Sequence, residues 1–304
     1  MKKRRLGNSD LFVSEIGLGC MSLGTNEAEA IHIIHKALDL GINFLDTADL
    51  YDYGLNEEFV GKALKGKRGE VILATKVGNR WTAEKNGWFW DPSKAYIKEE
   101  VKESLRRLGT DYIDLYQLHG GTIEDPISET IEAFEELKQE GVIRHYGLSS
   151  IRPNVIREYL KHSSIVSVLM EYSILNRRPE ELFPLLEEHH IGIIARGPLA
   201  KGLLTAHNSQ KLIQAKEKGY LSYSFTELQH TLGAVAQAVP SRPLEETAIQ
   251  YCLRHPVVAA VIPGASSIQQ LLANAKAGDA PPLTAKEYGG IQAITKQDRY
   301  ELHR

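Results

Sequence analysis

The chain repeats one arrangement of hydrophobic and polar positions: an amphipathic stretch, then a glycine, then a short and mainly apolar run. Ile31, Ile34 and Leu38 lie on one face of a predicted helix that would end before Gly41. The run that follows, residues 42–47, is short and apolar enough to be a buried strand. Glycine commonly ends helices because it adopts the left-handed conformation without strain. The arrangement therefore predicts helices that alternate with strands.

Eight short runs are candidates for strands, and predicted helices separate them. They are residues 17–19, 42–47, 71–76, 111–119, 142–150, 165–170, 191–198 and 257–264. Helical connections make neighbouring strands parallel and cover both faces of the sheet, which explains why the runs are nearly continuous in apolar residues. The sequence therefore predicts an α/β fold, a single (β/α)8 TIM barrel, for which about 250 residues is a typical length.

The 304 residues of the chain exceed that length, and three segments account for the excess. Residues 3–15 predict a polar N-terminal β-hairpin, residues 205–243 a long insertion, and residues 284–304 a charged C-terminal tail helix. No stretch rich in Pro, Gly or Ser divides the chain. We therefore expect one barrel domain over residues 1–304.

Composition and charge exclude several classes of protein. A hydrophobic fraction of 42% and a charged fraction of 25% are typical of globular proteins, and a net charge of -3 offers no basic surface for nucleic acid. Cys20 and Cys252 are too few and too far apart for a disulfide framework or a zinc site. No window approaches the ~18 consecutive apolar residues of a membrane-spanning helix, and the basic start lacks the apolar stretch of a signal peptide. We expect a soluble, cytoplasmic protein that binds neither nucleic acid nor membrane.

Polar side chains gather at the ends of the predicted strands. In a (β/α)8 barrel the chemistry lies at the carboxyl ends of the strands, where the loops converge. These ends carry Asp46, Lys76, His119, Ser149, Arg196 and Gly264. One charged residue at a strand end is commonly solvated or paired, but charge near a core is costly. Several ionisable groups at equivalent positions therefore favour a shared site.

Tyr51 follows Asp46 by five positions, which places a phenol on the loop above the same strand end. A phenol is protonated at neutral pH and donates its proton more readily when a cation stabilises the phenolate. Lys76 is the candidate cation, and Asp46 would hold Lys76 charged and fixed. His119 could orient a carbonyl oxygen through a hydrogen bond. The set predicts chemistry on a polar carbonyl group.

At these residues the sequence resembles the aldo-keto reductases, and in particular bacterial oxidoreductases of that family. DTADLY with Asp46 and Tyr51, ATK with Lys76, and DLYQLH with His119 are similar to the family's catalytic tetrad. The resemblance continues through GLGC, GLSS, EYSILNRR, GPLAKGLL and IPGASS, over nearly the whole chain. It implies reduction of a small aldehyde or ketone by NADPH, with NADH possible, with Tyr51 as general acid and with no metal.

The resemblance also implies a cofactor site. The residues that it assigns to the cofactor are Met21, Asp46, Ser149, Arg196, Gly197, Pro198, Leu199, Lys201, Gly264, Ser266, Gln270 and Asn274. Ser149 would bond the nicotinamide carboxamide, residues 197–201 would line the pyrophosphate, and residues 264–274 would hold the adenosine end.

Several positions depart from the family pattern. Ser150 stands where an asparagine is usual, Leu169 where a glutamine is expected, and Arg196 where an aromatic residue stacks on nicotinamide. Arg196 could instead cover the ring as a planar cation or reach a phosphate. The usual cation for the 2′-phosphate is absent among Ser266, Ser267 and Gln270, which bears on the choice between NADPH and NADH.

All three tryptophans lie between the third strand and its helix, at positions 81, 88 and 90. Exposed aromatic residues on a loop can form a wall for an apolar carbonyl substrate, so Trp81 and Trp88 are predicted to bind substrate. Trp90 has an equally good structural interpretation, in which it attaches the loop to the barrel.

The fold leaves a second function open, because one fold can carry unrelated activities. The alternative is a weakly catalytic, cofactor-sensing binding protein on the same barrel, like the potassium-channel beta subunits. The complete set of Asp46, Tyr51, Lys76 and His119 favours the enzyme. The oligomeric state and the physiological carbonyl compound stay open.

Overall fold

The computed structural model describes residues 1–206 and 208–304, and its centre is an eight-stranded parallel sheet. The strands are β3 (Leu18–Gly19), β4 (Phe44–Asp46), β5 (Ile72–Val77), β8 (Ile113–Leu118), β9 (Ile143–Ser149), β10 (Ser167–Glu171), β11 (Gly192–Arg196) and β12 (Val258–Ile262). They pair in chain order, and the parallel bridges Ile16–Val261 and Gly19–Gly264 join the two edges. The predicted (β/α)8 barrel is confirmed.

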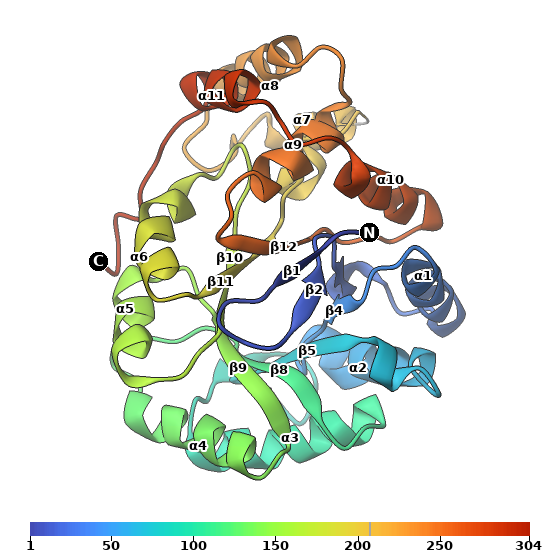
Figure 1. The fold of residues 1–304 in the computed structure, drawn as a ribbon, viewed down its shortest axis with the longest axis vertical. Helices are drawn as coiled ribbons and strands as arrows, with labels where there is room; N and C mark the ends of the chain where they lie inside the picture. The colour runs from blue at the N-terminus through green and yellow to red at the C-terminus, as the bar shows by residue number, and fades with distance from the viewer. Residues whose placement is uncertain (207) are drawn as a thin grey trace.

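Helices surround the sheet, as Figure 1 shows. They are α1 (Glu27–Asp39), α2 (Leu55–Ala63), α3 (Lys94–Leu108), α4 (Ile127–Gln139), α5 (Pro153–His162), α6 (Phe183–Glu188), α9 (Leu244–Leu253) and α10 (Ile268–Asp279). Their ends follow from local chemistry: the side chain of Ser93 accepts a hydrogen bond from the Tyr96 amide at the start of α3, and Gly109 ends this helix with a φ of 62°. A glycine thus ends this helix, in the role that the sequence predicts for Gly41.

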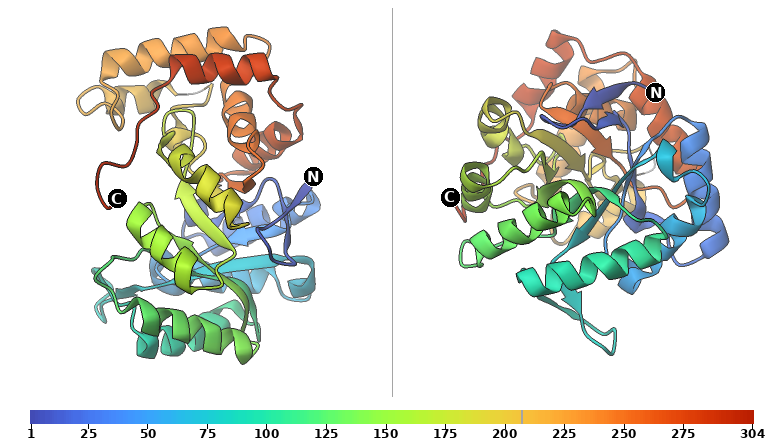
Figure 2. Two further views of the ribbon diagram at one scale, coloured as in Figure 1. Left: turned by 60° about the vertical axis from the view of Figure 1, so that its left-hand side comes forward. Right: turned by 60° about the horizontal axis from the view of Figure 1, so that its bottom comes forward.

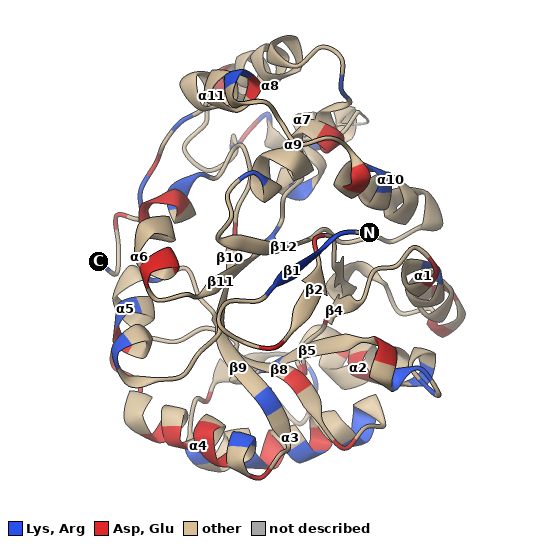
Figure 3. Cartoon of the chain, in the orientation of Figure 1, with Lys and Arg blue, Asp and Glu red and all other residues tan. Residues whose placement is uncertain are grey.

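Charged residues of both signs lie along α3 and α4 (Figure 3). Lys94 lies 2.6 Å and Lys98 2.7 Å from carboxylate oxygens of Glu136, so the two helices are joined by ion pairs at the surface. Such exposed pairs add little stability individually. The stability of the barrel therefore comes mainly from its buried apolar faces.

An N-terminal hairpin of β1 (Lys3–Arg5) and β2 (Phe12–Ser14) lies across one end of the barrel (Figure 1). The hairpin is present as predicted, but the expectation that it is polar is wrong. Leu6, Leu11 and Val13 are at most 1% exposed and pack with barrel residues such as Phe44 and Leu115. The hairpin closes the barrel because these apolar side chains have no other surface to cover.

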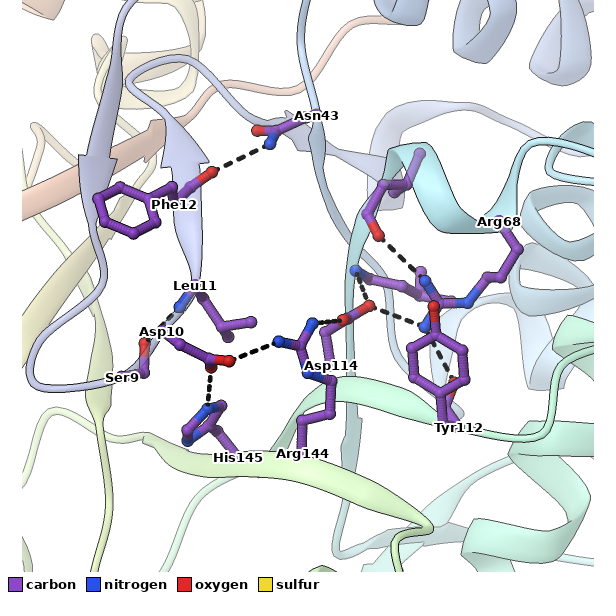
Figure 4. A network of polar contacts seen from close by, with 12 residues as sticks. Ser9, Asp10, Leu11, Phe12, Asn43, Arg68, Tyr112, Asp114, Arg144 and His145 are labelled. Carbon is purple, nitrogen blue, oxygen red and sulfur yellow. Dashed lines mark hydrogen bonds and ion pairs between the residues drawn. The ribbon is translucent and has the colours of Figure 1, made fainter.

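A polar network fastens the tip of this hairpin to the amino ends of β8 and β9 (Figure 4). Asp10 contacts His145 at 2.7 Å and Arg144 at 2.8 Å, and Arg144 also contacts Asp114 at 2.8 Å. Asp114 in turn accepts a hydrogen bond from Arg68 at 2.7 Å. The hydrogen bond from His145 and the neighbouring Arg144 hold the pKa of Asp10 below its usual value.

Two further helices lie in the predicted insertion, and a third follows the barrel. These are α7 (Ser209–Ala215), α8 (Phe225–Ala238) and α11 (Ala285–Ile294), and Figure 2 shows α8 and α11 side by side. The predicted tail helix over 284–304 is wrong in its extent, because helix α11 ends at Ile294. The Arg177 side chain donates to the carbonyl oxygens of Gln292 and Thr295, which satisfies the end of this helix and lets the chain continue extended. Across the described ranges, no helix combines the length and the apolar character needed to cross a membrane.

Candidate active site

Neighbouring strands bring three of the predicted residues to one edge of the barrel. Asp46 is the last residue of β4, Lys76 lies one position before the end of β5, and His119 directly follows β8. The strands pair in the order β4, β5, β8, and Lys76 lies beside Gln117 in the register. Because parallel strands end at the same edge, these side chains converge.

The ammonium of Lys76 joins Asp46 to Tyr51. Its Nζ lies 2.6 Å from Asp46 Oδ1, 2.7 Å from the Thr47 carbonyl oxygen and 3.2 Å from the Tyr51 hydroxyl oxygen. Lys76 is only 1% exposed, and burial alone would lower its pKa, but the charge of Asp46 and the contact with Tyr51 raise this pKa to about 12. The side chain therefore stays a cation with all three of its donors in use.

The loop that carries Tyr51 is constrained by its backbone and by a buried contact. Tyr51 begins the short 3-10 helix η2 (Tyr51–Gly54), in which Asp52 and Tyr53 have φ angles of 48° and 53°. Two consecutive non-glycine residues in the left-handed region are costly and persist only where surrounding contacts hold them. One such contact joins the hydroxyl of Thr47 to the side-chain oxygen of buried Asn56 at 2.7 Å. The phenol is thus held over the end of β4.

His119 lies beside the tyrosine as a neutral imidazole. The ring centroids of Tyr51 and His119 are 6.0 Å apart, with the ring planes at 84°. Burial, with smaller effects from the cations Lys76 and Arg196, lowers the pKa of His119 to about 3. Its Nδ1 is buried and has no hydrogen-bond partner among the described residues. The ring therefore has hydrogen-bonding capacity that the rest of the site does not use.

Gln117 is a site residue that the analysis of the sequence missed. Its side chain is fully buried, and its Nε2 donates a hydrogen bond of 2.9 Å to Asp46 Oδ2. A glutamine within the apolar strand DLYQL was the available signal, because a buried amide is costly unless it is bonded.

The segment predicted to line the pyrophosphate leaves β11 in an unusual backbone conformation. Gly197, Ala200 and Lys201 all have positive φ angles, of 65°, 48° and 57°. Pro198 and Leu199 lie between them, in the turn that leads to the short 3-10 helix η5 (Ala200–Gly202). Residues 197–201 thus form a tight loop at the barrel rim, and left-handed residues in such loops are common where backbone amides face a ligand.

Arg196 is paired, and Ser149 and Met21 lie at other points of the same rim. The guanidinium of Arg196 contacts Glu171 Oε2 at 3.1 Å, because their strands pair at this position. Ser149 ends β9, and the side chain of Met21 is 65% exposed just after β3. The predicted nicotinamide residues therefore come from three different strand ends.

The residues predicted for the adenosine end gather at the start of α10. The amide of Ser266 donates to Gln270 Oε1 at 2.9 Å, and the side chain of Asn274 donates to the Gly264 carbonyl at 3.2 Å. A Cβ on Gly264 would meet the Ser22 hydroxyl at 2.3 Å, so only glycine fits there. These four predicted residues are thus close together, next to the helix N-terminus.

The three tryptophans lie on an antiparallel hairpin of β6 (Asn79–Trp81) and β7 (Trp88–Trp90). Trp90 donates from Nε1 to Asp125 Oδ1 at 2.9 Å and is only partly exposed, which supports its structural interpretation. Trp81 packs against the Tyr53 ring and under the Arg107 guanidinium, and lines a cavity of about 660 Å³ with them. Trp88 is 57% exposed. A role for Trp81 and Trp88 in substrate binding stays a prediction.

Comparison with known proteins identifies the family. Residues 15–296 match the profile of the aldo/keto reductase family. The chain belongs to the aldo-keto reductase family. This aldo-keto reductase is 60% identical over 305 residues to "Uncharacterized oxidoreductase YqkF" of Bacillus subtilis (strain 168), with 100% of both chains covered. It is 38% identical over 228 residues to the NADH-specific methylglyoxal reductase of Escherichia coli (strain K12), over 67% of this chain and 69% of that protein.

Solved structures agree with this assignment. The holo form of aldo-keto reductase AKR11C1 from Bacillus halodurans matches this aldo-keto reductase with a TM-score of 0.96 and 63% identity, covering 100% of this chain and 99% of that one. The apo form of the same protein matches with a TM-score of 0.88 and 60% identity, at the same coverage. The family predicted from the motifs is confirmed, and the chain is an oxidoreductase of a family that uses a nicotinamide cofactor.

The rim residues of this aldo-keto reductase fit a dinucleotide. The left-handed residues of 197–201 can present backbone amides to an anion, and the N-terminus of α10 adds the positive end of a helix dipole. The anionic part of a dinucleotide thus has matching groups at this edge of the barrel.

Proposed function

We propose that this aldo-keto reductase reduces small aldehydes or ketones to alcohols, with NADPH as the hydride donor. The observation that carries the proposal is the buried line of contacts from Asp46 through Lys76 to the Tyr51 hydroxyl. A reduced nicotinamide, when bound, supplies the hydride for the carbonyl carbon. The chain itself must supply a proton for the carbonyl oxygen and must hold the substrate in place.

Tyr51 is the proton donor in this proposal. Its hydroxyl lies 3.2 Å from the Lys76 ammonium, which stabilises the phenolate that remains after proton donation. Asp46 lies 2.6 Å from the same ammonium and keeps it fixed and charged. Charge develops on the substrate oxygen as the hydride arrives, and a cation held beside the proton donor lowers the cost of that charge.

His119 orients the substrate oxygen in this proposal. Its lowered pKa, about 3, leaves a neutral ring at physiological pH, so it acts through a hydrogen bond and not as a proton source. A neutral imidazole has one N–H to donate, and the ring lies edge-on to Tyr51. The carbonyl oxygen would thus lie between the imidazole and the phenol.

Ser149, the 197–201 loop and the residues at the start of α10 would hold the cofactor. The segment from 263 to 275 contains no Lys or Arg, so a 2′-phosphate there would rely on hydroxyl and amide groups. NADH is therefore the alternative donor, and the similar enzyme of Escherichia coli carries the name of an NADH-specific reductase. Assays with both cofactors decide between them.

The alternative function, a cofactor-sensing binding protein, is not favoured. The similar proteins are named as oxidoreductases or reductases, and the four groups needed for carbonyl reduction lie together here. A sensing protein would need the cofactor site but not the cation beside the phenol.

Tyr51→Phe tests the proposal. The variant keeps the ring and removes the proton, so turnover of a panel of aromatic, aliphatic and dicarbonyl substrates should fall roughly 10²–10⁴-fold while cofactor affinity is retained. The change in absorbance of the reduced nicotinamide measures turnover, and fluorescence titration measures affinity. Tyr53→Phe, two positions along the same loop, is the matched control and should keep its activity. Turnover of Tyr51→Phe at the level of the unmodified protein would refute the role of Tyr51.

A further inference from the structure

The two oxygens of the Asp46 carboxylate have different partners. Oδ1 lies 2.6 Å from the Lys76 ammonium, and Oδ2 accepts a hydrogen bond of 2.9 Å from Gln117 Nε2. Gln117 is fully buried in β8, directly beside Lys76 in the strand register. Its amide oxygen is buried without a hydrogen-bond partner among the described residues. Within the described part of the chain, Gln117 thus leaves its amide oxygen unbonded, while its amide nitrogen makes a hydrogen bond to one oxygen of Asp46.

The direction of the Gln117 amide follows from chemistry as well as from the coordinates. An amide oxygen turned toward Asp46 Oδ2 would place two acceptors against each other, which is repulsive. The N–H end must therefore face the carboxylate, whose other oxygen lies 2.6 Å from the Lys76 ammonium. A leucine would fill the same space without leaving a buried oxygen unbonded, so packing alone does not account for a glutamine here.

We propose that Gln117 is a positioning residue for carbonyl reduction, which fixes the second oxygen of Asp46 and thereby sets how strongly Lys76 acts on Tyr51. The inference rests on the proposed function. The hydrogen bond from Gln117 partly offsets the negative charge of Asp46. The carboxylate therefore cancels less of the positive charge of Lys76.

Removal of this hydrogen bond changes the field at Tyr51 in a definite direction. Without Gln117, the charge of Asp46 cancels more of the Lys76 cation, and the phenolate of Tyr51 is less stabilised. The proton of Tyr51 is then given up less readily at neutral pH and is lost only at higher pH. The alkaline limb of the kcat profile should therefore move to higher pH, while kcat at neutral pH falls.

Gln117→Leu is the first test, with kcat measured across pH at saturating reduced cofactor and substrate. We expect kcat at neutral pH to fall roughly tenfold to a hundredfold, the usual effect of losing a hydrogen bond to a charged group. The pH at which kcat falls on the alkaline side should increase by about one unit. KM and the cofactor affinity, measured by fluorescence titration, should change less than about twofold, because neither ligand is contacted by Gln117 in this proposal.

Gln250→Leu is the matched control. Gln250 is another buried glutamine, in α9. Its Nε2 donates a hydrogen bond of 2.8 Å to the Ala277 carbonyl oxygen. Loss of this hydrogen bond in Gln250→Leu should lower the free energy of unfolding about as much as Gln117→Leu does. It should leave the pH profile of kcat unchanged. A purely structural role for Gln117 predicts the same behaviour in both variants.

Gln117→Glu is the second test. It still tests the proposal if the leucine variant fails to fold. Its carboxyl group would be protonated at low pH, would donate to Asp46 as the amide does, and would keep kcat close to that of the unmodified protein. As pH rises it would lose this proton beside Asp46, so kcat should fall at a lower pH than in the unmodified protein. The leucine and glutamate variants thus move the alkaline limb in opposite directions.

Profiles of both variants that superimpose on that of an active unmodified protein would overturn the inference about Gln117 and leave the proposed function standing. An unmodified protein that binds reduced cofactor but reduces no carbonyl in the panel would overturn the proposed function and this inference with it. A shift of KM alone, with the limb unmoved, would also overturn the inference, because it would place Gln117 in substrate binding.

Discussion

His119 shows how the barrel rim determines the charge state of a single residue. Burial and the cations Lys76 and Arg196 lower its pKa from 6.5 to about 3. Between these two values the unfolded chain binds a proton that the folded chain does not. The contribution to stability is therefore complete above pH 6.5 and is lost as pH falls toward 3. The lowered pKa of His119 thus makes the stability of the fold sensitive to acid.

We predict that His119→Gln makes the protein less sensitive to acid. At pH near 5 the unmodified protein should have lost about 2 kcal/mol of unfolding free energy through this one residue, and the variant should not lose it. Denaturant unfolding at neutral pH and near pH 5 measures the difference. His162→Gln is the control, because the side chain of His162 is 59% exposed. The same loss on acidification in His119→Gln and in the unmodified protein would contradict the lowered pKa.

The connection between β4 and α2 shows, at the scale of an element, how burial shifts the pKa of a side chain. Asp49 in this connection is fully buried, and its Oδ1 accepts a hydrogen bond of 2.6 Å from the Leu50 amide. Burial, and then the charges of Glu57 and Glu100, raise its pKa well above the usual value. Arg107 forms ion pairs with both glutamates, but it is a single cation beside the three carboxyl groups of Asp49, Glu57 and Glu100. The folded state therefore keeps a proton on Asp49 that the unfolded state releases.

We predict that Asp49→Asn gains stability relative to the unmodified protein as pH rises. A carboxyl group with a raised pKa stabilises the fold fully below its ordinary pKa, and this contribution is lost as pH rises toward the raised value. An amide does not titrate, so the difference in unfolding free energy between the variant and the unmodified protein should shift by more than about 1 kcal/mol from pH 5 to pH 8. Asp111→Asn, at an exposed position, is the control. A difference that stays constant with pH would refute a proton on Asp49.

The elements that the sequence predicted well are those whose pattern depends on the barrel alone. Each parallel strand is buried on both faces, so its apolar run is visible without knowledge of its neighbours. The end of α11 was missed because Arg177, more than a hundred residues away in the chain, satisfies its last carbonyl groups. Gln117 was missed because its partner Asp46 lies on another strand, and only the register brings them together. Contacts between distant segments leave no local pattern.

At the scale of the whole molecule the two ends of the barrel have separate roles. The carboxyl ends of the strands carry Asp46, Lys76 and His119, while the hairpin covers the end where β8 and β9 begin. The hairpin was predicted as polar, and its loop does contain Asn8, Ser9 and Asp10. Its apolar residues are too few to show a period, and only the open barrel end explains their burial. We therefore expect that stability can be changed at the hairpin end without changing the proposed chemistry at the other end.

Leu11→Ala and Phe12→Ala test this separation with two adjacent residues. Leu11, directly before β2, is 1% exposed and packed under the barrel, whereas Phe12, the first residue of β2, is 55% exposed. Leu11→Ala should lower the unfolding free energy by about 2–5 kcal/mol through lost burial and a cavity, while Phe12→Ala should change it by less than about 0.5 kcal/mol. Both variants should keep kcat, KM and the pH profile at temperatures where they are folded, since the groups proposed to react lie at the other end of the strands. A changed pH profile in Leu11→Ala would show that the hairpin acts on the site through the strands, and the two ends would then have to be treated as one unit.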